Sequence, residues 1–316
     1  MVTFWALARR NVVLIGFFAV VLLFSIREPE LISVENITQV LRQSAVAGII
    51  AVGVTFVVVA GRFDLSVGSL LSLCVVMAVY LHDKIGPAGA VIATLAIGLV
   101  IGMMNGALVA ILGLNSLITT LGMLSILQGV TFVLLDGHSP IIFRPDATWF
   151  GIFGRSYING VPTPVVILLV TAAGMALLLA RSTFGRCVYA VGANETASMY
   201  SSIDVKKIVF CTYLISGVLT AVAALVLASR VMSGQNSTGS GYEMTVLSGI
   251  ILGGTSLSGG SGSVTRSVIG ILMLGFIANS LVMLGLPYVF QWIITWTIIV
   301  VAVWTELAFT RGRVFA

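Results

Sequence analysis

Long apolar stretches alternate with short polar segments along almost the whole chain. Several of these stretches run for about 17 to 25 residues without a charge, which is enough for a helix to cross about 30 Å of hydrocarbon. The apolar stretch 44–81 is too long for one crossing and is interrupted by polar residues at 61–66, so we divide it there. The pattern predicts ten membrane spans, at about 11–26, 44–60, 67–81, 88–112, 116–135, 164–180, 208–229, 245–258, 264–285 and 289–309.

The predicted fold is an all-α polytopic membrane protein in which 1–316 form a single transmembrane domain with both termini inside. The span 245–258 is short and rich in glycine, so it fits a re-entrant segment as well as a full crossing. The segments 47–55 and 248–256 share a Gly-Ile-Ile pattern followed by a second glycine. Two five-helix halves related by a pseudo-twofold axis would explain this similarity. Chance similarity between apolar, Gly-rich segments explains it equally well.

Composition and charge agree with the membrane prediction. Hydrophobic residues make up 59% of the chain and charged residues 9%, with a mean hydropathy of +1.14, whereas a soluble domain carries about 25% charged residues. The net charge of +5 does not indicate nucleic-acid binding, because Lys and Arg lie at span ends, ten on the predicted inside and six outside. The three cysteines (Cys74, Cys187 and Cys211) form no pattern typical of a disulfide framework or a metal site.

The Gly- and Ser-rich segment 253–263 suggests chemistry at first sight. It lacks the Lys-Ser/Thr pair of a phosphate-binding loop, and so does the rest of the chain, so if ATP powers this protein the nucleotide is bound elsewhere. Ser261 lies in the G-x-S-G pattern of serine intramembrane proteases, which requires a nearby base. The two histidines, His82 and His138, fall on the opposite predicted face of the membrane. We therefore expect no catalytic residue and expect the glycines to break a helix.

Small and amide side chains in the predicted spans indicate close helix packing. Three glycines in 98–106 recur every four residues, which lets a neighbouring backbone approach that helix face. Asn105 and Asn279 are amides within apolar spans, so each needs a polar partner. These two residues either join helices by hydrogen bonds or, together with Thr119, line a path for a polar solute.

The spans carry little charge that could couple transport to an ion gradient. Asp64 and Glu306 are the nearest candidates, and both lie near predicted span ends. Asp64 is expected to cap the helix that begins near Leu65, because an Asp in that position accepts backbone N–H bonds. Ion-coupled transport therefore has no evident physical basis here, whereas a passive facilitator stays open.

The longest polar interruption on the predicted inside is the loop at about 181–207. Asn194 can cap a short helix at about 195–201, with Glu195 favourably placed at its positive end. On the residues alone, this loop is either a simple connector or the handle by which a soluble partner moves the spans.

Five segments, in order along the chain, resemble the ribose/xylose/galactoside-type permeases of bacterial ABC importers. They are FDLSVGS at 63–69, GMMNGALV at 102–109, TTLGM at 119–123, TFGRCVYAVGANETA at 183–197, and GSGYE at 239–243 leading into LGGTSLSGGSGSV at 252–264. The residues that the resemblance assigns to family motifs are Asp64, Leu65, Ser66, Gly68, Gly253, Gly254, Gly259 and Gly260. The chain departs from the family pattern at Arg62, Ser202 and Trp296, where glycine is usual, and at 265–267.

The resemblance implies a subunit without ATPase activity of its own. A second permease subunit, identical or sister, would complete the path across the membrane, and a periplasmic sugar-binding protein would deliver the solute. ABC ATPase subunits would bind ATP and magnesium and dock on the inside. The residues expected to contact the ATPase are Asn194, Glu195, Thr196, Ala197 and Ser198.

We therefore expect a multi-pass permease subunit of the bacterial cytoplasmic (inner) membrane. It would import a small neutral sugar or sugar-like solute with energy from its partner ATPase, with no cofactor of its own and no nucleic-acid partner. The alternative is a self-sufficient facilitator or ion-coupled secondary carrier, which would transport without an ATPase.

Overall fold

The structure is a computed structural model, and it describes residues 21–22, 25–143, 148–287, 289–290, 293–294, 296–297 and 300. The chain divides into two compact units, one formed by 44–271 and the other by 1–43 together with 272–316. The predicted spans 11–26 and 289–309 lie largely outside the described residues. The prediction of a single transmembrane domain stays a prediction.

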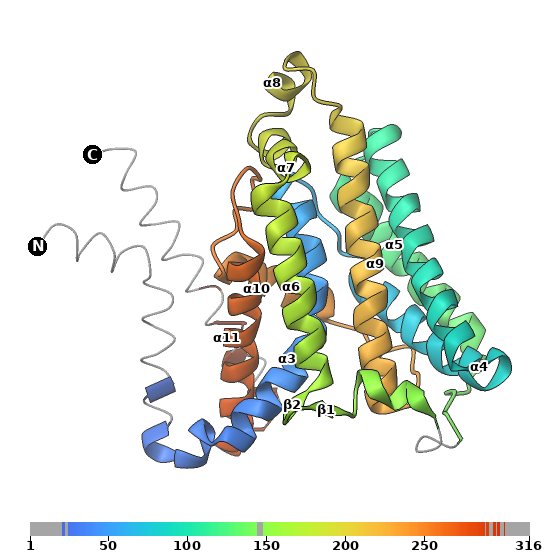
Figure 1. Cartoon of the computed structure of the whole chain (residues 1–316), viewed down its shortest axis with the longest axis vertical. Coiled ribbons are helices and arrows are strands. Elements are labelled where there is room, and N and C mark those ends of the chain that lie inside the picture. Colours follow the sequence, from blue (N-terminus) through green and yellow to red (C-terminus); the bar gives the residue numbers. More distant parts are fainter. Residues whose placement is uncertain are drawn as a thin grey trace, which may run out of the picture. The chain divides into compact units, whose positions relative to one another are not determined.

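Helices form almost all of the regular structure (Figure 1). In chain order the elements are η1 (Pro29–Ile32), α3 (Val34–Val59), α4 (Val67–Gly106), the π-helical turn η2 (Ala107–Ile111), α5 (Ser116–Leu135), η4 (Trp149–Phe153), β1 (Tyr157–Ile158), β2 (Val161–Pro162), α6 (Thr163–Arg181), α7 (Thr183–Ala193), α8 (Glu195–Tyr200), α9 (Val205–Val231), α10 (Tyr242–Leu252) and α11 (Val264–Met283). The strands β1 and β2 form a small antiparallel hairpin in which Tyr157 pairs with Pro162.

Six helices among the described residues are long and apolar enough to cross a membrane by length and composition: α3, α4 with η2, α5, α6, α9 and α11. They contain the predicted spans 44–60, 67–81, 88–112, 116–135, 164–180, 208–229 and 264–285 within a residue or two at most ends. The exposed faces are apolar, as lipid requires: on α5, Ile118, Phe132 and Val133 are 71%, 66% and 76% exposed. This confirms an all-α multi-pass membrane protein, whereas the count of ten spans is not established.

The helix α3 begins at Val34, well before the predicted span 44–60. The predicted span begins where the apolar run begins. A helix can extend beyond that run through polar residues, because its backbone hydrogen bonds are made within the helix. The acidic residue Glu35 in the first turn is favourable there, because the helix N-terminus carries partial positive charge.

The helix α4 is a hairpin of two arms. Its backbone breaks at Gly86, with φ 78°, directly before Pro87, which cannot continue the preceding helical turn. A straight helix of 40 residues would place its ends about 60 Å apart. Instead, Asn105 Nδ2 at the end donates to Ser66 Oγ at the start over 2.8 Å. The predicted division into 67–81 and 88–112 is therefore confirmed, and Figure 1 shows the chain turning back.

The second arm of α4 packs against α9 through small residues. A Cβ atom added to Gly98 would lie 2.5 Å from both the Ala221 Cβ and the Gly217 carbonyl oxygen. A Cβ atom added to Gly102 would lie 2.7 Å from the Tyr213 carbonyl oxygen. Separations this short do not occur between real atoms, so glycine is required for this helix spacing. The close packing predicted from the glycine repeat is confirmed.

Of the two alternatives for 245–258, a full helical span does not fit the structure. The helix α10 has 11 residues, a length of about 16 Å, which is about half of the hydrocarbon thickness. After Leu252 the chain turns without helix until Val264. The physical reason is glycine: Gly254, Gly259 and Gly260 have φ of 80°, 82° and 72°, which other residues adopt only with strain. The expectation that these glycines break a helix is confirmed.

The two segments with a shared sequence pattern meet at one residue of α11. Thr55 Oγ1 on α3 donates to Ser267 Oγ over 2.9 Å, and Thr255 Oγ1 lies 3.3 Å from the same atom. However, α3 has 26 residues and α10 has 11, so the sequence similarity does not extend to equal helices. The pseudo-twofold repeat stays a prediction.

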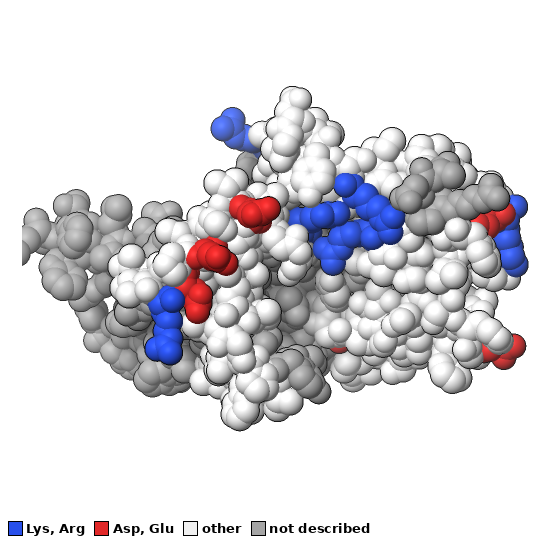
Figure 2. Space-filling model, turned by 90° about the horizontal axis from the view of Figure 1, so that it is seen from below, with Lys and Arg blue, Asp and Glu red and all other residues white. Residues whose placement is uncertain are grey.

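Positive charge is present at both ends of the unit 44–271. At the end opposite α8, Arg155 Nε donates to the carbonyl oxygen of Arg230 over 3.2 Å, at the last turn of α9. Figure 2 views that end and shows Lys and Arg side chains gathered on it. This agrees with the moderate charge bias in the sequence, and the orientation in the membrane stays a prediction.

Candidate functional site

The predicted handle 181–207 contains two helices where the sequence predicted one. α6 ends at Arg181, and Ser182 caps α7 by accepting the Gly185 N–H on its hydroxyl oxygen over 2.9 Å. The 11-residue helix α7 is an addition to the predicted elements, because its polar residues are more typical of a loop. The signal was present: Val188 and Val191 stand three residues apart and both are buried.

The short helix α8 is the predicted one. The Asn194 side-chain oxygen accepts the Ala197 N–H over 2.9 Å, so the predicted cap is confirmed. The chain then turns at Ser202, whose φ of 61° lies in the left-handed region that favours glycine. The sequence resemblance leads us to expect glycine at this position. In this chain serine therefore stands where the backbone conformation favours glycine.

Most of α8 is presented to solvent, and Figure 1 shows it at the tip of its unit, beyond the first turn of α9. Asn194, Thr196 and Ala197 are exposed, and Glu195 is half-buried. Ser198 differs, because its side chain is buried and its hydroxyl donates to the Asn194 carbonyl oxygen over 2.9 Å.

Two residues at the tip lie beyond the five named as ATPase contacts: Met199 is 56% exposed and Tyr200 is 88% exposed. A large aromatic side chain standing free in water at a helix end is typical of a contact surface for another protein. A signal for both residues was available, because they follow directly after the five residues expected to contact an ATPase.

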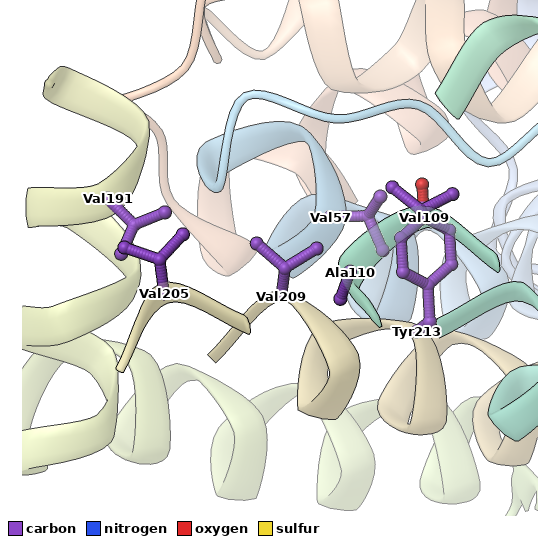
Figure 3. Packing of buried hydrophobic residues seen from close by; sticks show 7 residues of the cluster. All are labelled: Val57, Val109, Ala110, Val191, Val205, Val209 and Tyr213. Carbon is purple, nitrogen blue, oxygen red and sulfur yellow. The ribbon is translucent and has the colours of Figure 1, made fainter. Parts of the chain in front are cut away.

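An apolar cluster lies beneath this handle and joins four elements (Figure 3). It contains Val57 of α3, Val109 and Ala110 of η2, Val191 of α7, and Val205, Val209 and Tyr213 of α9. Figure 3 shows Val191 and Val205 side by side, with the remaining side chains continuing toward α3. Because protein interiors are close-packed, α7 and the first turns of α9 cannot shift without displacing the end of α3.

A backbone junction connects α7 to α3 and to the Gly-rich turn. The Gly260 N–H donates to the Val59 carbonyl oxygen over 2.9 Å. A Cβ atom added to Gly192, at the end of α7, would lie 2.6 Å from Gly260 N and closer still to the Val59 oxygen. The Tyr189 hydroxyl also donates to the Gly262 carbonyl oxygen over 2.8 Å. The end of α7 therefore meets α3 and the Gly-rich turn directly at the backbone of Gly192, and the Tyr189 side chain adds a hydrogen bond to the same turn.

The segment 61–66, between α3 and α4, is held from several sides. Arg62 Nη2 pairs with Glu195 Oε2 of α8 at 2.7 Å. The Phe63 N–H donates to Ser116 Oγ at the start of α5 over 3.2 Å. The Phe63 carbonyl oxygen accepts the Tyr213 hydroxyl of α9 over 2.7 Å. This short segment thus links α8, α5 and α9.

Asp64 does not cap a helix, so that prediction is wrong. α4 begins at Val67, and Asp64 Oδ1 accepts the N–H of Ser66 over 3.2 Å and its hydroxyl over 2.6 Å in a local turn. Asp64 Oδ2 accepts the Ser216 hydroxyl of α9 over 2.8 Å. The cause is tertiary, because Ser216 lies 152 residues away and turns the carboxylate into an interhelical connector.

The Asp64 carboxyl group is buried in the loop between α3 and α4. Burial raises the pKa of Asp64 above its ordinary value, because the charged form loses water, while the hydrogen bonds from Ser66 and Ser216 oppose that rise. Its hydrogen bonds from two hydroxyls and one N–H leave its oxygens satisfied, which reduces the penalty of burying it.

A cavity of about 790 Å³ opens between the segment 61–63, the turn 109–117, α8 and the start of α9. Its lining is mostly apolar, with charges from Arg62, Glu195 and Lys206. The ion pair between Arg62 and Glu195 forms part of its wall. The handle is therefore not packed solidly against the segment 61–63, and there is room for α8 to move.

Of the three candidates for the solute path, Asn105 contacts the family-motif residue Ser66. It is 1% exposed and donates to Ser66 Oγ, while its Oδ1 atom is buried and has no hydrogen-bond partner among the described residues. Thr119 is half-buried on the first turn of α5. Asn279 lies on the part of α11 that belongs to the second unit. A role for these residues in lining a path stays a prediction.

Two further family segments pack against each other at the start of α4. A Cβ atom added to Gly68 would lie 2.8 Å from the Gly239 carbonyl oxygen. The Gly239 N–H donates to Ser72 Oγ over 2.8 Å. The FDLSVGS and GSGYE segments therefore form one structural contact although they lie far apart in sequence.

Neither histidine is placed to activate Ser261. His82 lies between Asp83 Oδ1 at 2.6 Å and Thr148 Oγ1 at 2.8 Å, near the break of α4. His138 Nδ1 lies 2.8 Å from the Asp136 carbonyl oxygen, in the turn after α5. Ser261 lies in the turn beside Gly260, which contacts α3 and α7 at the α8 end. The geometry gives no support to a hydrolase.

Known proteins resemble this chain over most of its length. It is 37% identical over 302 residues to the ribose import permease protein RbsC of Escherichia coli strain K12, covering 95% of this chain and 93% of that protein. It is 38% identical over 294 residues to the ribose import permease protein RbsC of Haemophilus influenzae strain Rd, covering 91% of each. It is 35% identical over 287 residues to the D-allose transport system permease protein AlsC of Escherichia coli strain K12, covering 90% of this chain and 87% of that protein.

No solved structure matches the chain. The family model described as branched-chain amino acid transport system / permease component matches residues 36–303. The matched range holds the described helices from α3 to α11, including the handle and the Gly-rich turn that contacts it. The chain therefore belongs to the branched-chain amino acid transport system / permease component family, and within it resembles permeases of ABC sugar importers.

Proposed function

We propose that this protein is the permease subunit of an ATP-driven ABC importer for a small neutral sugar or sugar-like solute. The observation that carries the proposal is α8, a capped helix at the tip of its unit with Met199 and Tyr200 exposed. It follows directly on α7, whose Gly192 meets α3 and the Gly-rich turn through backbone, and its Glu195 pairs with Arg62 in the segment after α3. A helix of this kind is suited to receive force from a soluble partner.

The proposed solute is uncharged. Among the described residues, the buried polar side chains are hydroxyls and one amide, apart from Asp64 and His82. Hydroxyl and amide groups can exchange hydrogen bonds with a sugar without the penalty of an unpaired charge. The relatives named above are described as permeases for ribose and D-allose, which are neutral monosaccharides.

The proposed partners are those of an ABC importer, and the similarity to permeases of sugar importers supports them. ABC ATPase subunits bind ATP and magnesium and contact α8 through Asn194, Glu195, Thr196 and Ala197, with Met199 and Tyr200 added by the structure. Ser198 is buried, and its hydroxyl stabilises the start of α8 by donating to the Asn194 carbonyl oxygen. A second permease subunit, identical or sister, completes the path, and a periplasmic sugar-binding protein docks at the opposite end. The protein lies in the bacterial inner membrane with both termini cytoplasmic.

The proposed mechanism is a movement between two packed arrangements. Closure of the ATPase subunits displaces α8 and α7 together. The junction of Gly192 with Val59 and Gly260, and the apolar cluster around Val57, pass the displacement to α3 and to the turn before α11. Packed interfaces of this kind switch between discrete states, which opens the path alternately to each side.

The test is uptake by the purified complex in proteoliposomes. Labelled D-ribose, D-allose and L-arabinose are supplied outside with the binding protein, and ATP is supplied on the ATPase side. We expect uphill uptake of at least one sugar that requires ATP and stops with a hydrolysis-deficient ATPase. Uptake that persists without the ATPase would instead establish the self-sufficient facilitator or ion-coupled carrier.

A further inference from the structure

The ion pair between Arg62 and Glu195 joins two regions that are 133 residues apart in sequence. Arg62 Nη2 lies 2.7 Å from Glu195 Oε2, and the two side chains are 31% and 40% exposed. Arg62 stands where the sequence resemblance leads one to expect glycine, which has no side chain to reach α8. A chain with glycine at this position, as the family motif has, could not form this ion pair.

Each partner sits on a rigid support. Glu195 is the first residue of α8, whose start is held by Asn194 and whose end is held by the Ile203 N–H donating to the Ser198 carbonyl oxygen over 3.1 Å. The Arg62 N–H donates to the Val57 carbonyl oxygen over 3.0 Å, which binds it to the end of α3. A displacement of Glu195 is thus a displacement of α8 as a whole, and Arg62 transmits it to the end of α3.

The segment after Arg62 leads directly into the buried polar network. Phe63 is bonded through its N–H to Ser116 and through its carbonyl oxygen to Tyr213. Asp64 is bonded to Ser66 and Ser216. The Ser66 hydroxyl oxygen in turn accepts a hydrogen bond from the Asn105 side-chain amide. Movement at Arg62 therefore reaches α5 and α9 through Phe63 and Asp64, and α4 through Ser66, all within four residues of chain.

The pair is held at one point. Arg62 contacts Glu195 through Nη2, and its buried Nε atom has no hydrogen-bond partner among the described residues. A planar guanidinium held by a single nitrogen lacks the rigid two-point geometry of a bidentate pair. The adjoining cavity of about 790 Å³ gives both side chains room to separate. These features fit a contact that forms and breaks, not a permanent structural clamp.

We propose that Arg62 is a positioning residue that couples α8 to the segment 61–66 through Glu195, and so makes transport depend on ATP hydrolysis. This inference rests on the proposed function. In it, Glu195 is held from inside by Arg62 while its neighbours on α8 contact the ATPase. Losing the pair disconnects ATP hydrolysis from the movement of α3, α4 and α9, while the backbone junction at Gly192 keeps the fold.

The experiment measures sugar transported per ATP hydrolysed by the complete complex in proteoliposomes, with D-ribose as the probe and D-allose and L-arabinose in parallel. The variants are R62E, E195R, the charge-swapped double variant R62E/E195R, and the conservative variant R62K. The control is K207E, which makes the same charge change at an exposed residue at the start of α9, with no salt bridge among the described residues.

We expect R62E and E195R each to lower the ratio of transport to hydrolysis about two- to fivefold, the range that a partly exposed ion pair contributes. The ATPase rate of R62E should stay at the wild-type level. The double variant should recover most of the ratio, R62K should keep it, and K207E should leave it unchanged. Should R62E fail to assemble, the milder R62Q, E195Q and R62Q/E195Q give the same double-mutant cycle.

An unchanged ratio in R62E overturns the inference while leaving the proposed function in place. A double variant no better than E195R also overturns it, because Glu195 would then act on the ATPase and not through Arg62. If the wild-type complex shows no ATP-dependent uptake of any of the three sugars, both the proposed function and this inference fail.

Discussion

Tyr213 on α9 donates its hydroxyl to the backbone carbonyl oxygen of Phe63, in the segment between α3 and α4, over 2.7 Å. The two residues are 150 positions apart. The side chain of Tyr213 is fully buried and also belongs to the apolar cluster beneath the handle. One side chain thus joins the apolar and polar halves of the proposed transmission route.

The first prediction concerns this bond. Tyr213→Phe keeps the ring in the cluster but removes the donor to the Phe63 carbonyl oxygen, and a buried acceptor left without its partner destabilises a protein by about 1–3 kcal/mol. We expect a lower unfolding temperature of the purified permease in detergent. Tyr200→Phe is the matched control, because Tyr200 is 88% exposed and its hydroxyl lies in water. Equal unfolding temperatures for both variants would show that the bond does not contribute.

The second prediction concerns the backbone junction. Gly192→Ala places a Cβ atom 2.6 Å from Gly260 N and against the Val59 carbonyl oxygen, so α7 must move away from both. We expect ATP-dependent sugar uptake to be lost in proteoliposomes that contain normal amounts of the complex. Gly174→Ala on α6 is the control, because its Cβ atom meets nothing within 4 Å. Alanine there should be neutral or stabilise α6 by up to about 1 kcal/mol.

A Gly192→Ala variant with full ATP-dependent uptake would contradict the close contact at the junction. A loss of uptake in Gly174→Ala to the same degree would show that any added methyl group in these helices is harmful, and the comparison would then carry no support for the junction.

The third prediction concerns Ser202, whose φ is 61°. Left-handed backbone costs a residue with a Cβ atom about 1–2 kcal/mol, and glycine does not bear this cost. Part of the gain is offset because glycine is more flexible in the unfolded chain, by about 0.4–1 kcal/mol. Ser202→Gly should therefore match or exceed the wild type in thermal unfolding, whereas Ser202→Ala, which keeps the Cβ atom, should not. The opposite order would mean that the left-handed turn is not present in the protein.

The fourth prediction concerns the charge of Asp64. Burial raises its pKa in the folded protein above the ordinary value of 3.8, so folding favours the protonated form. The stabilising contribution of the carboxyl group is then fully present below the unfolded pKa and is lost as the pH rises through the folded pKa. Asp64→Asn cannot titrate. We therefore expect the unfolding temperature of the wild type, relative to Asp64→Asn, to fall as the pH rises from about 4 to about 8.

A rise of that difference with pH would show that the hydroxyls of Ser66 and Ser216 outweigh burial and hold the carboxylate charged. In either case Asp64→Ala should be less stable than Asp64→Asn across the range. Alanine leaves the donors of Ser66 and Ser216 without their acceptor, whereas asparagine keeps one oxygen and offers an amide to the other partner.

Several features were within reach of the sequence because they depend on nearby residues. The membrane helices follow from uninterrupted apolar runs, the cap of α8 from Asn194 three residues before the N–H it accepts, and the close approach of α4 to α9 from glycines every four residues. The missed helix α7 belongs in the same group, since Val188 and Val191 carried its periodicity.

The sequence by itself determined that this is a helical membrane protein with a polar handle between two spans, because hydrocarbon admits only helices whose backbone bonds are made within the segment. Only the tertiary structure decided that Asp64 bonds to Ser216 and that Arg62 reaches Glu195. These contacts join residues more than a hundred positions apart, and their hydrogen-bonding partners are chosen by packing, which no local pattern records.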